Sequence, residues 1–218
     1  AEYWFNPPQS DLEKSVAIYE RILEYKESPK YNEALYRLGW AYYKLNNFSE
    51  AIRYFTLLAD DVTRAEEIDP NNKFTNPNLR EESIEYIGVS FLDHSGVEGA
   101  EAFLSALGGR GYGIEILRKI GDAYMEVKEE HEKAVAAYKL LLKLYPYAPD
   151  APVIQAKIAE SYRYLEDDEQ TYLVRKELFR KYNEGSEWWV RVEDEDARTK
   201  GRGLAEHALR SNINMLLD

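Results

Sequence analysis

Residues 33–59 read EALYRLGWAYYKLNNFSEAIRYFTLLA, and this stretch decides the fold. Its first half spaces apolar or small residues at i, i+3, i+4 and i+7, namely Leu35, Leu38, Gly39 and Tyr42. Its second half repeats that spacing with Phe48, Ala51, Ile52, Phe55 and Leu58. This period puts the side chains on one face of a helix, and the Asn46-Asn47 pair between the halves is a turn signal. The stretch therefore predicts an antiparallel helix hairpin.

The hairpin recurs along the chain with a small residue at the same place in each first helix. Gly39 is followed by Gly88, by Gly121 and, in a weaker copy, by Ala159. The spacings between these positions are 49, 33 and 38 residues, and two of them lie near a period of about 34. We therefore expect an all-α fold, a right-handed α-solenoid of antiparallel helix hairpins.

The repeat positions divide the chain into a tail, a repeat array and a cap. Turn signals without helical periodicity, such as Asp69-Pro70 and Asn76-Pro77, predict an insertion that explains the long first spacing. The array is expected over residues 11–183. Its expected segments are a tail at 1–10, a half repeat at 11–27, repeats at about 31–59, 81–107, 114–146 and 151–183, an insertion at 60–80, and C-terminal capping helices at 184–218.

Both ends of the array have apolar surface that needs a cover. The half repeat at 11–27 is a second helix without its first, so we expect the array to continue upstream in the full-length protein. Two covers for its open face are considered, namely self-association with a second copy and folding back of Tyr3, Trp4 and Phe5. At the other end, a bulky Trp188-Trp189 lid and a capping helix with one long apolar stripe are expected to cover the last repeat. The stripe consists of Ala197, Gly201, Leu204, Ala208, Ile213 and Leu216.

These motifs resemble the tetratricopeptide repeat. The resemblance is carried by Leu35-x-x-Leu38-Gly39-x-x-Tyr42, then Ala51-x-x-x-Phe55, with Pro146 closing a later unit, and it covers roughly residues 11–183. It implies a non-enzymatic scaffold that binds a segment of another protein on its concave side. The style of residues 38–43 and 145–150 also resembles repeat proteins of the bacterial cell envelope, which implies a periplasmic or outer-membrane-associated setting, with the cytoplasm as the alternative.

In this family the partner-facing positions flank the close-packed ones on the first helices. Carried over to this chain, they are Tyr36, Arg37, Trp40, Tyr43, Lys44, Tyr86, Val89, Arg118, Lys119, Asp122, Lys157, Glu160 and Arg163. Tyr36, Trp40 and Tyr43 give one helix a second aromatic face, and aromatic side chains on a rigid surface anchor peptides well. They could instead pack against the preceding repeat or against the 60–80 insertion.

Composition excludes several other classes of function. Lys+Arg 28 against Asp+Glu 40 gives a net charge of −12, which disfavours nucleic acid and anionic membranes. Without cysteine, and with His94, His131 and His207 isolated from each other, no metal or cofactor site is predicted. Acidic runs at 166–169 and 193–196 are predicted to lie at a turn and a helix start. One alternative stays open, in which this chain forms the non-catalytic helical region of a larger envelope enzyme.

Overall fold

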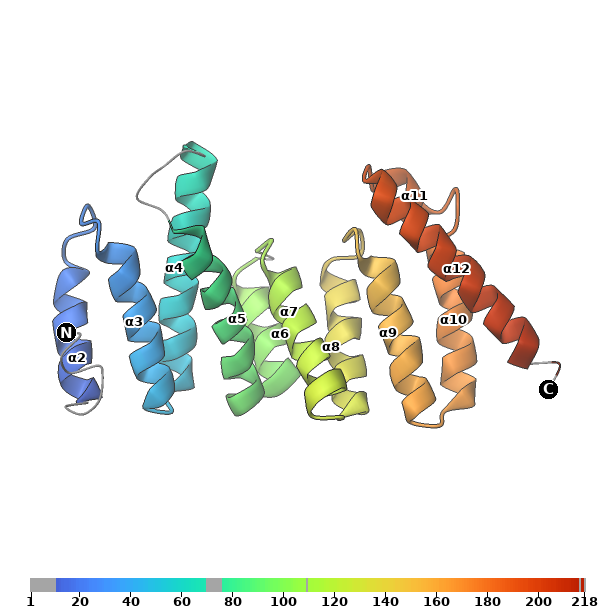
Figure 1. Cartoon of the computed structure of the whole chain (residues 1–218), viewed down its shortest axis with the longest axis horizontal. Coiled ribbons are helices and arrows are strands. Elements are labelled where there is room, and N and C mark those ends of the chain that lie inside the picture. The colour runs from blue at the N-terminus through green and yellow to red at the C-terminus, as the bar shows by residue number, and fades with distance from the viewer. Residues whose placement is uncertain (1–10, 70–75, 109, 216, 218) are drawn as a thin grey trace. The chain divides into compact units, whose positions relative to one another are not determined.

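The computed structural model describes residues 11–69, 76–108, 110–215 and 217 of the 218-residue chain. Secondary structure in these ranges is helical, and none of their residues forms a strand. The chain divides into two compact units, residues 1–96 and 97–218, and each is described by itself. Within each unit the two helices of a hairpin run antiparallel (Figure 1), and this arrangement confirms the predicted all-α repeat fold.

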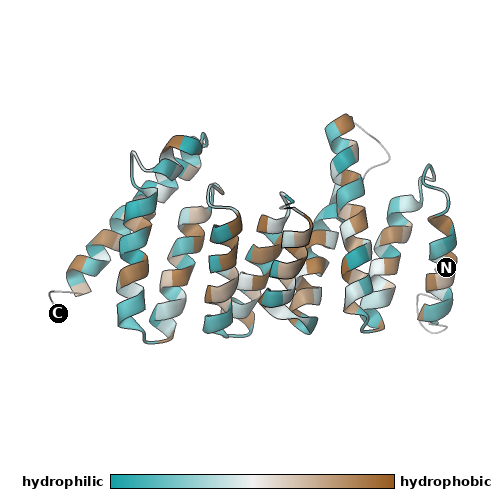
Figure 2. Ribbon diagram, turned by 180° about the vertical axis from the view of Figure 1, so that it is seen from behind, coloured by the Kyte–Doolittle hydropathy of each residue, from teal (hydrophilic) through white to brown (hydrophobic). Residues whose placement is uncertain are grey.

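Unit 1 is a row of helices, each packed against the next. It contains α2 (Leu12–Ile22), α3 (Tyr31–Lys44), α4 (Phe48–Ile68) and α5 (Pro77–His94). The apolar stripe read from residues 33–59 forms its core, because Leu35, Leu38 and Phe55 are fully buried. Apolar and polar residues alternate around each helix (Figure 2), as expected when only one stripe of a helix is buried.

Two expectations about unit 1 need correction. The helix predicted over 11–27 ends at Ile22, because the chain then turns towards α3. The pattern of segment 60–80 predicts an insertion without helical structure, yet α4 continues to Ile68 and α5 already begins at Pro77. Val62 is fully buried, and this contact supports the extra turns of α4, which extends past α3 in Figure 1. Residues 70–75 of the insertion, like Tyr3, Trp4 and Phe5, lie outside the described residues.

The turn between the two helices of a hairpin has the predicted chemistry. Asn46 has a left-handed backbone with φ 57°, and Asn47 caps α4 because its side chain accepts a hydrogen bond from the Glu50 amide at 3.3 Å. Another hairpin in unit 2 reuses this geometry, with Glu166 at φ 57° and Asp167 accepting from the Gln170 amide at 2.9 Å. The acidic run at 166–169 therefore forms a turn and a helix cap.

Glycine at the repeat position lets the two helices of a hairpin approach closely. A Cβ atom on Gly39 would lie 2.5 Å from Cε1 of Phe55, and one on Gly121 would lie 2.3 Å from Cε1 of Tyr138. Both rings are fully buried, so they fill the space that the missing side chain leaves. In these two hairpins the glycine of the first helix is thus required by an aromatic ring in the second helix.

Unit 2 begins within the predicted repeat 81–107, since the division falls after Gly96. Its helices are α6 (Gly96–Ala106, whose first residue ends unit 1), α7 (Gly113–Asp122), the π-helix η1 (Ala123–Val127), α8 (His131–Leu144), α9 (Ala151–Tyr164), α10 (Asp168–Tyr182), α11 (Glu187–Arg191) and α12 (Glu195–Met215). From α7 to α10 each helix packs on its neighbour in sequence. The sequence pattern does not predict the π-helix.

A long helix covers the last repeat, as predicted, although its stripe is shorter than expected. α12 packs along α10 and also contacts α9, while buried Trp188 lies against Gly201 of α12. Ala205 and Ala208 are buried, but Ile213 is 48% exposed, because the end of α12 lacks a neighbour among the described residues. Leu216 lies outside the described residues.

Candidate functional site

The predicted partner-facing residues fall into two groups, one in each unit. In unit 1 they belong to α3 and α5, and in unit 2 to α7 and α9. Most are half-buried at the edge of the helix packing, while the exposed members are Lys44, Glu160 and Arg163. The structure brings residues together within each group, and we treat the groups separately.

The unit 1 group forms a continuous aromatic cluster between α3 and α5. The ring centroid of Trp40 lies 4.3 Å from that of Tyr86 and 5.8 Å from that of Tyr43. Tyr86 also lies 5.6 Å from Phe55 in the core, which in turn contacts Tyr36 edge-on at 6.2 Å. The first-helix face of unit 1, defined by Tyr36, Trp40, Tyr43 and Tyr86, is therefore a half-buried surface anchored on the core.

Carboxylates of α5 hold two of these tyrosines in place. The Tyr43 hydroxyl donates a hydrogen bond to Asp93 at 2.6 Å, and the Tyr36 hydroxyl donates to Glu82. The hydrogen bond to Asp93 and partial burial raise the pKa of Tyr43 to about 12. Burial, with the bond to Glu82, raises the pKa of Tyr36 to about 12 as well. Both phenols remain neutral donors at physiological pH.

The rings of Trp40 and Tyr43 have a neighbour that neither sequence alternative named. The sequence left packing against the preceding repeat or against the 60–80 insertion open, but Trp40 and Tyr43 contact Tyr86 on the following first helix, α5. This pairing arises because α3 and α5 lie next to one another, with α4 packed against both. Val89, the other predicted partner-facing residue of α5, is also half-buried.

The unit 2 group is ionic where the unit 1 group is aromatic. Lys157 of α9 reaches Asp122 of α7 at 2.7 Å and Glu126 of the π-helix at 3.2 Å. Asp122 also accepts a hydrogen bond from the Tyr138 hydroxyl at 2.6 Å, so its carboxylate joins α7, α8 and α9. Arg118 pairs with Asp150 at 2.6 Å. The charges on this face largely neutralise one another.

The same helix positions thus carry aromatic rings in one unit and paired charges in the other. Trp40 and Asp122 both follow the close-packed glycine directly. Glu160 and Arg163 lie on the next first helix, α9, and both are exposed. Their side chains pair only loosely with each other, at 3.8 Å. Repeat position alone therefore does not determine the chemistry of the first-helix face.

Sequence comparison agrees with this architecture. Residues 9–71 and residues 115–146 each match a model of the tetratricopeptide repeat. The chain is a tetratricopeptide repeat protein. The first match spans the described helices α2, α3 and α4, and the second spans most of α7 together with η1 and α8. No match was found among curated proteins.

Several residues of the first-helix faces were missed from sequence. In unit 1, Glu82 and Asp93 of α5 accept hydrogen bonds from the α3 tyrosines. Glu82, Tyr86, Val89 and Asp93 follow one another at helical spacing on α5. That spacing could have identified them. Glu126 of unit 2 could not be found this way, because the π-helix shifts its position relative to an ordinary helix.

The described ranges offer no metal site of the usual kind. No cluster of His, Asp and Glu suited to a metal ion occurs among these residues, and no helix there is long and apolar enough to cross a membrane. His131 stacks on Tyr164 with centroids 4.7 Å apart, and His94 stacks on Phe48 at 5.9 Å. Tetratricopeptide repeats are generally non-catalytic scaffolds, in keeping with these structural roles.

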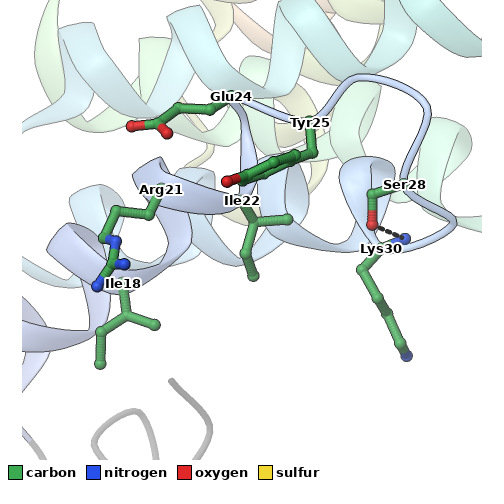
Figure 3. A pocket seen from close by; sticks show the side chains of 7 residues that line it. All are labelled: Ile18, Arg21, Ile22, Glu24, Tyr25, Ser28 and Lys30. Atoms are coloured by element: carbon green, nitrogen blue, oxygen red, sulfur yellow. Dashed lines mark hydrogen bonds between the residues drawn. The ribbon is translucent and has the colours of Figure 1, made fainter.

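A separate hollow lies on α2 and the turn that follows it. This cavity of about 410 Å³ is lined by Ile18, Arg21, Ile22, Glu24, Tyr25, Ser28 and Lys30 (Figure 3). It contains none of the predicted partner-facing residues. It does include Ile18 and Ile22, two apolar side chains of the half repeat at 11–27, for which self-association was one expected cover. Tyr25 is 67% exposed there, so this end of the tetratricopeptide array keeps accessible apolar surface.

Proposed function

We propose that the first-helix face of unit 1 binds a partner protein through a segment that combines a basic with an apolar side chain. The repeats themselves support a protein–protein interaction scaffold. The observation that carries the finer proposal is the half-buried cluster of Tyr36, Trp40, Tyr43 and Tyr86. Such rings offer a large contact area on rigid helices, so little conformational entropy is lost when a partner binds.

The charges around the cluster favour a basic partner. Glu82, Glu85 and Asp93 lie on α5, the helix that also carries Tyr86, and all three side chains are exposed. The ammonium of Lys44 lies 5.8 Å from the ring centre of Trp40, so this ring already accommodates a cation. With a net charge of −12, the whole chain attracts basic partners over long range.

A selection from random peptides tests this proposal without assuming a particular partner. A peptide library displayed on phage is selected on the full chain, and selected peptides are measured on variants by fluorescence anisotropy. We expect selected peptides to place Arg or Lys beside an aromatic or aliphatic residue. Trp40→Ala/Tyr43→Ala should weaken them by about 30-fold, as for two residues at the centre of an interface.

Two variants make the result specific. Glu82→Gln/Asp93→Asn keeps acceptors for the tyrosine hydroxyls but removes two charges, so it should weaken binding mainly at low salt. Tyr25→Ala removes an exposed aromatic from the turn after α2 and serves as the matched control. Circular dichroism confirms that each variant is folded. If the peptides bind the Trp40→Ala/Tyr43→Ala chain as tightly as the parent chain, this face is not the binding site.

The cellular setting is a further part of the proposal. An envelope scaffold is suggested by the resemblance of residues 38–43 and 145–150 to envelope repeat proteins. Fractionation of cells that produce the full-length protein tests it. Recovery of the protein entirely with the cytoplasm would contradict the envelope setting, while leaving the binding surface itself unaffected.

A further inference from the structure

A second cavity, in unit 2, has walls of a different character from the first-helix faces. Its volume is about 330 Å³, and it lies where α8 and α10 end and α11 begins. It is lined by Leu142, Pro146, Tyr147, Arg180, Lys181, Tyr182, Ser186, Glu187 and Trp188. None of these residues belongs to the surface proposed above, so the inference below is independent of the proposed function.

Two buried aromatic side chains give this cavity a rigid wall. Trp188 and Tyr182 are each 3% exposed, and their rings meet edge to face at 5.4 Å. The indole Nε1–H of Trp188 donates to the Ala148 carbonyl at 2.9 Å, which fixes the ring. The Tyr182 hydroxyl, in contrast, makes no hydrogen bond to any described residue. The hydroxyl oxygen itself is accessible to solvent, so a ligand can reach it at the edge of the ring packing.

The charge that remains available at the rim is positive. Glu187 is already compensated, because it accepts a hydrogen bond from Tyr147 at 2.7 Å and pairs with Arg191 at 2.8 Å. Lys181 pairs with Glu177 at 2.7 Å. Arg180 is exposed and makes no hydrogen bond or ion pair within the described parts of the chain, although its charge also acts on Glu177 one turn earlier. Its guanidinium can bind a carboxylate through two parallel hydrogen bonds.

We propose that this cavity binds an acidic segment of a partner protein. A carboxylate of the segment pairs with Arg180, and a neighbouring apolar side chain enters the cavity against Trp188 and Leu142. The volume of about 330 Å³ accommodates one large side chain and lies at the lower end of the range for ligand pockets. The chain would then carry two binding surfaces of opposite charge preference, one on the first helices of unit 1 and one at the ends of second helices in unit 2.

Helix electrostatics offers a competing reason for the cations. Arg180 and Lys181 lie in the last turn of α10, where positive charge complements the helix dipole whether or not a ligand binds. The test must therefore measure binding separately from stability. Arg175 lies five residues earlier on the same helix and does not line the cavity, so Arg175→Gln is a control with the same change in charge.

The probe is a short peptide, acetyl-Asp-Glu-Phe-Asp-Glu-amide, added to the full ¹⁵N-labelled chain. The indole N–H signal of Trp188 is assigned with a Trp188→Phe variant and followed by NMR at about 0.15 M salt, where long-range repulsion from the acidic chain is screened. We expect a saturable shift of this signal, with Arg180→Gln weakening binding about two- to fivefold and Arg175→Gln leaving it unchanged. Melting temperatures of both variants are recorded to separate any loss of stability.

Two further peptides identify which part of the probe is recognised. Replacing Phe by Gly keeps the charge and should remove the Trp188 shift, and replacing all four acidic residues by Lys should remove it as well. A Lys-substituted peptide that shifts the Trp188 signal as strongly as the acidic one would overturn the proposal. So would an acidic peptide that leaves the Trp188 signal in place, or equal binding by the Arg180→Gln and Arg175→Gln chains.

Discussion

Replacement of Gly39 by Ala tests the packing that defines the hairpin. A Cβ atom at this position would lie 2.5, 2.6 and 2.8 Å from three ring atoms of Phe55, which is fully buried. Because the ring cannot move into solvent, the helices must separate or the ring must leave its rotamer. Such overpacking costs about 1–3 kcal/mol, and three simultaneous close contacts place Gly39→Ala near the upper end.

Helix propensity opposes this loss but does not cancel it. Ala in a helix interior is favoured over Gly by about 1 kcal/mol, so the net loss of unfolding free energy should be about 2 kcal/mol. For a chain of this size that corresponds to a fall in melting temperature of roughly 4–8 °C. Urea unfolding followed by far-UV circular dichroism measures the free energy, and differential scanning calorimetry measures the temperature.

Gly203 supplies the matched control. It also lies within a helix, α12, but nothing lies within 4 Å of a Cβ built on it. Gly203→Ala should therefore stabilise the chain by about 1 kcal/mol. Adding Phe55→Leu to Gly39→Ala should recover part of the loss, because the smaller side chain leaves room. The reasoning is refuted if Gly39→Ala stabilises the chain as Gly203→Ala does.

Three further predictions concern the polar contacts. The folded-state pKa of Tyr36 and Tyr43 is raised from 10.0 to about 12, so the stability they contribute is complete below pH 10 and is lost as the pH rises through about 12. The fall in melting temperature over this window should be smaller in Tyr36→Phe/Tyr43→Phe, and an equal fall would contradict this account. Lys157→Met should lower the unfolding free energy by about 1 kcal/mol, and a double-mutant cycle with Asp122→Asn should give a coupling of at least about 0.5 kcal/mol, whereas strict additivity would exclude the contact. Trp188→Phe should cost about 1–2 kcal/mol in urea unfolding, since a buried carbonyl loses its donor, and an unchanged midpoint would argue against that hydrogen bond.

Local patterns in the sequence predicted the repeat fold well. The i, i+3, i+4, i+7 spacing around Gly39 sets which stripe of a helix is buried, and Asn46-Asn47 sets where the chain reverses. Both depend on residues within a few positions of each other, so they can be recognised from one helix or turn alone. The small residue at each repeat position likewise indicates close helix packing, although it does not indicate which aromatic ring fills the space.

The contacts made by the first-helix faces depended on residues that are distant in the sequence. Tyr43 and Asp93 are fifty positions apart, and Asp122 and Lys157 are thirty-five apart. Only the packing of successive first helices brings such pairs together, and sequence spacing within one helix does not report it. The additional turns of α4 up to Ile68 have the same cause, because burial of Val62 stabilises a segment whose own pattern indicated an insertion.

The sequence by itself thus determined that this chain folds into tetratricopeptide hairpins and which small residues allow their helices to meet. The tertiary structure decided that the aromatic face of α3 meets α5, that the matching face of unit 2 is closed by ion pairs, and that a cavity forms beside Trp188. Helix periodicity is local and can be read along the chain. Complementarity between side chains is set by neighbours that only folding brings into contact.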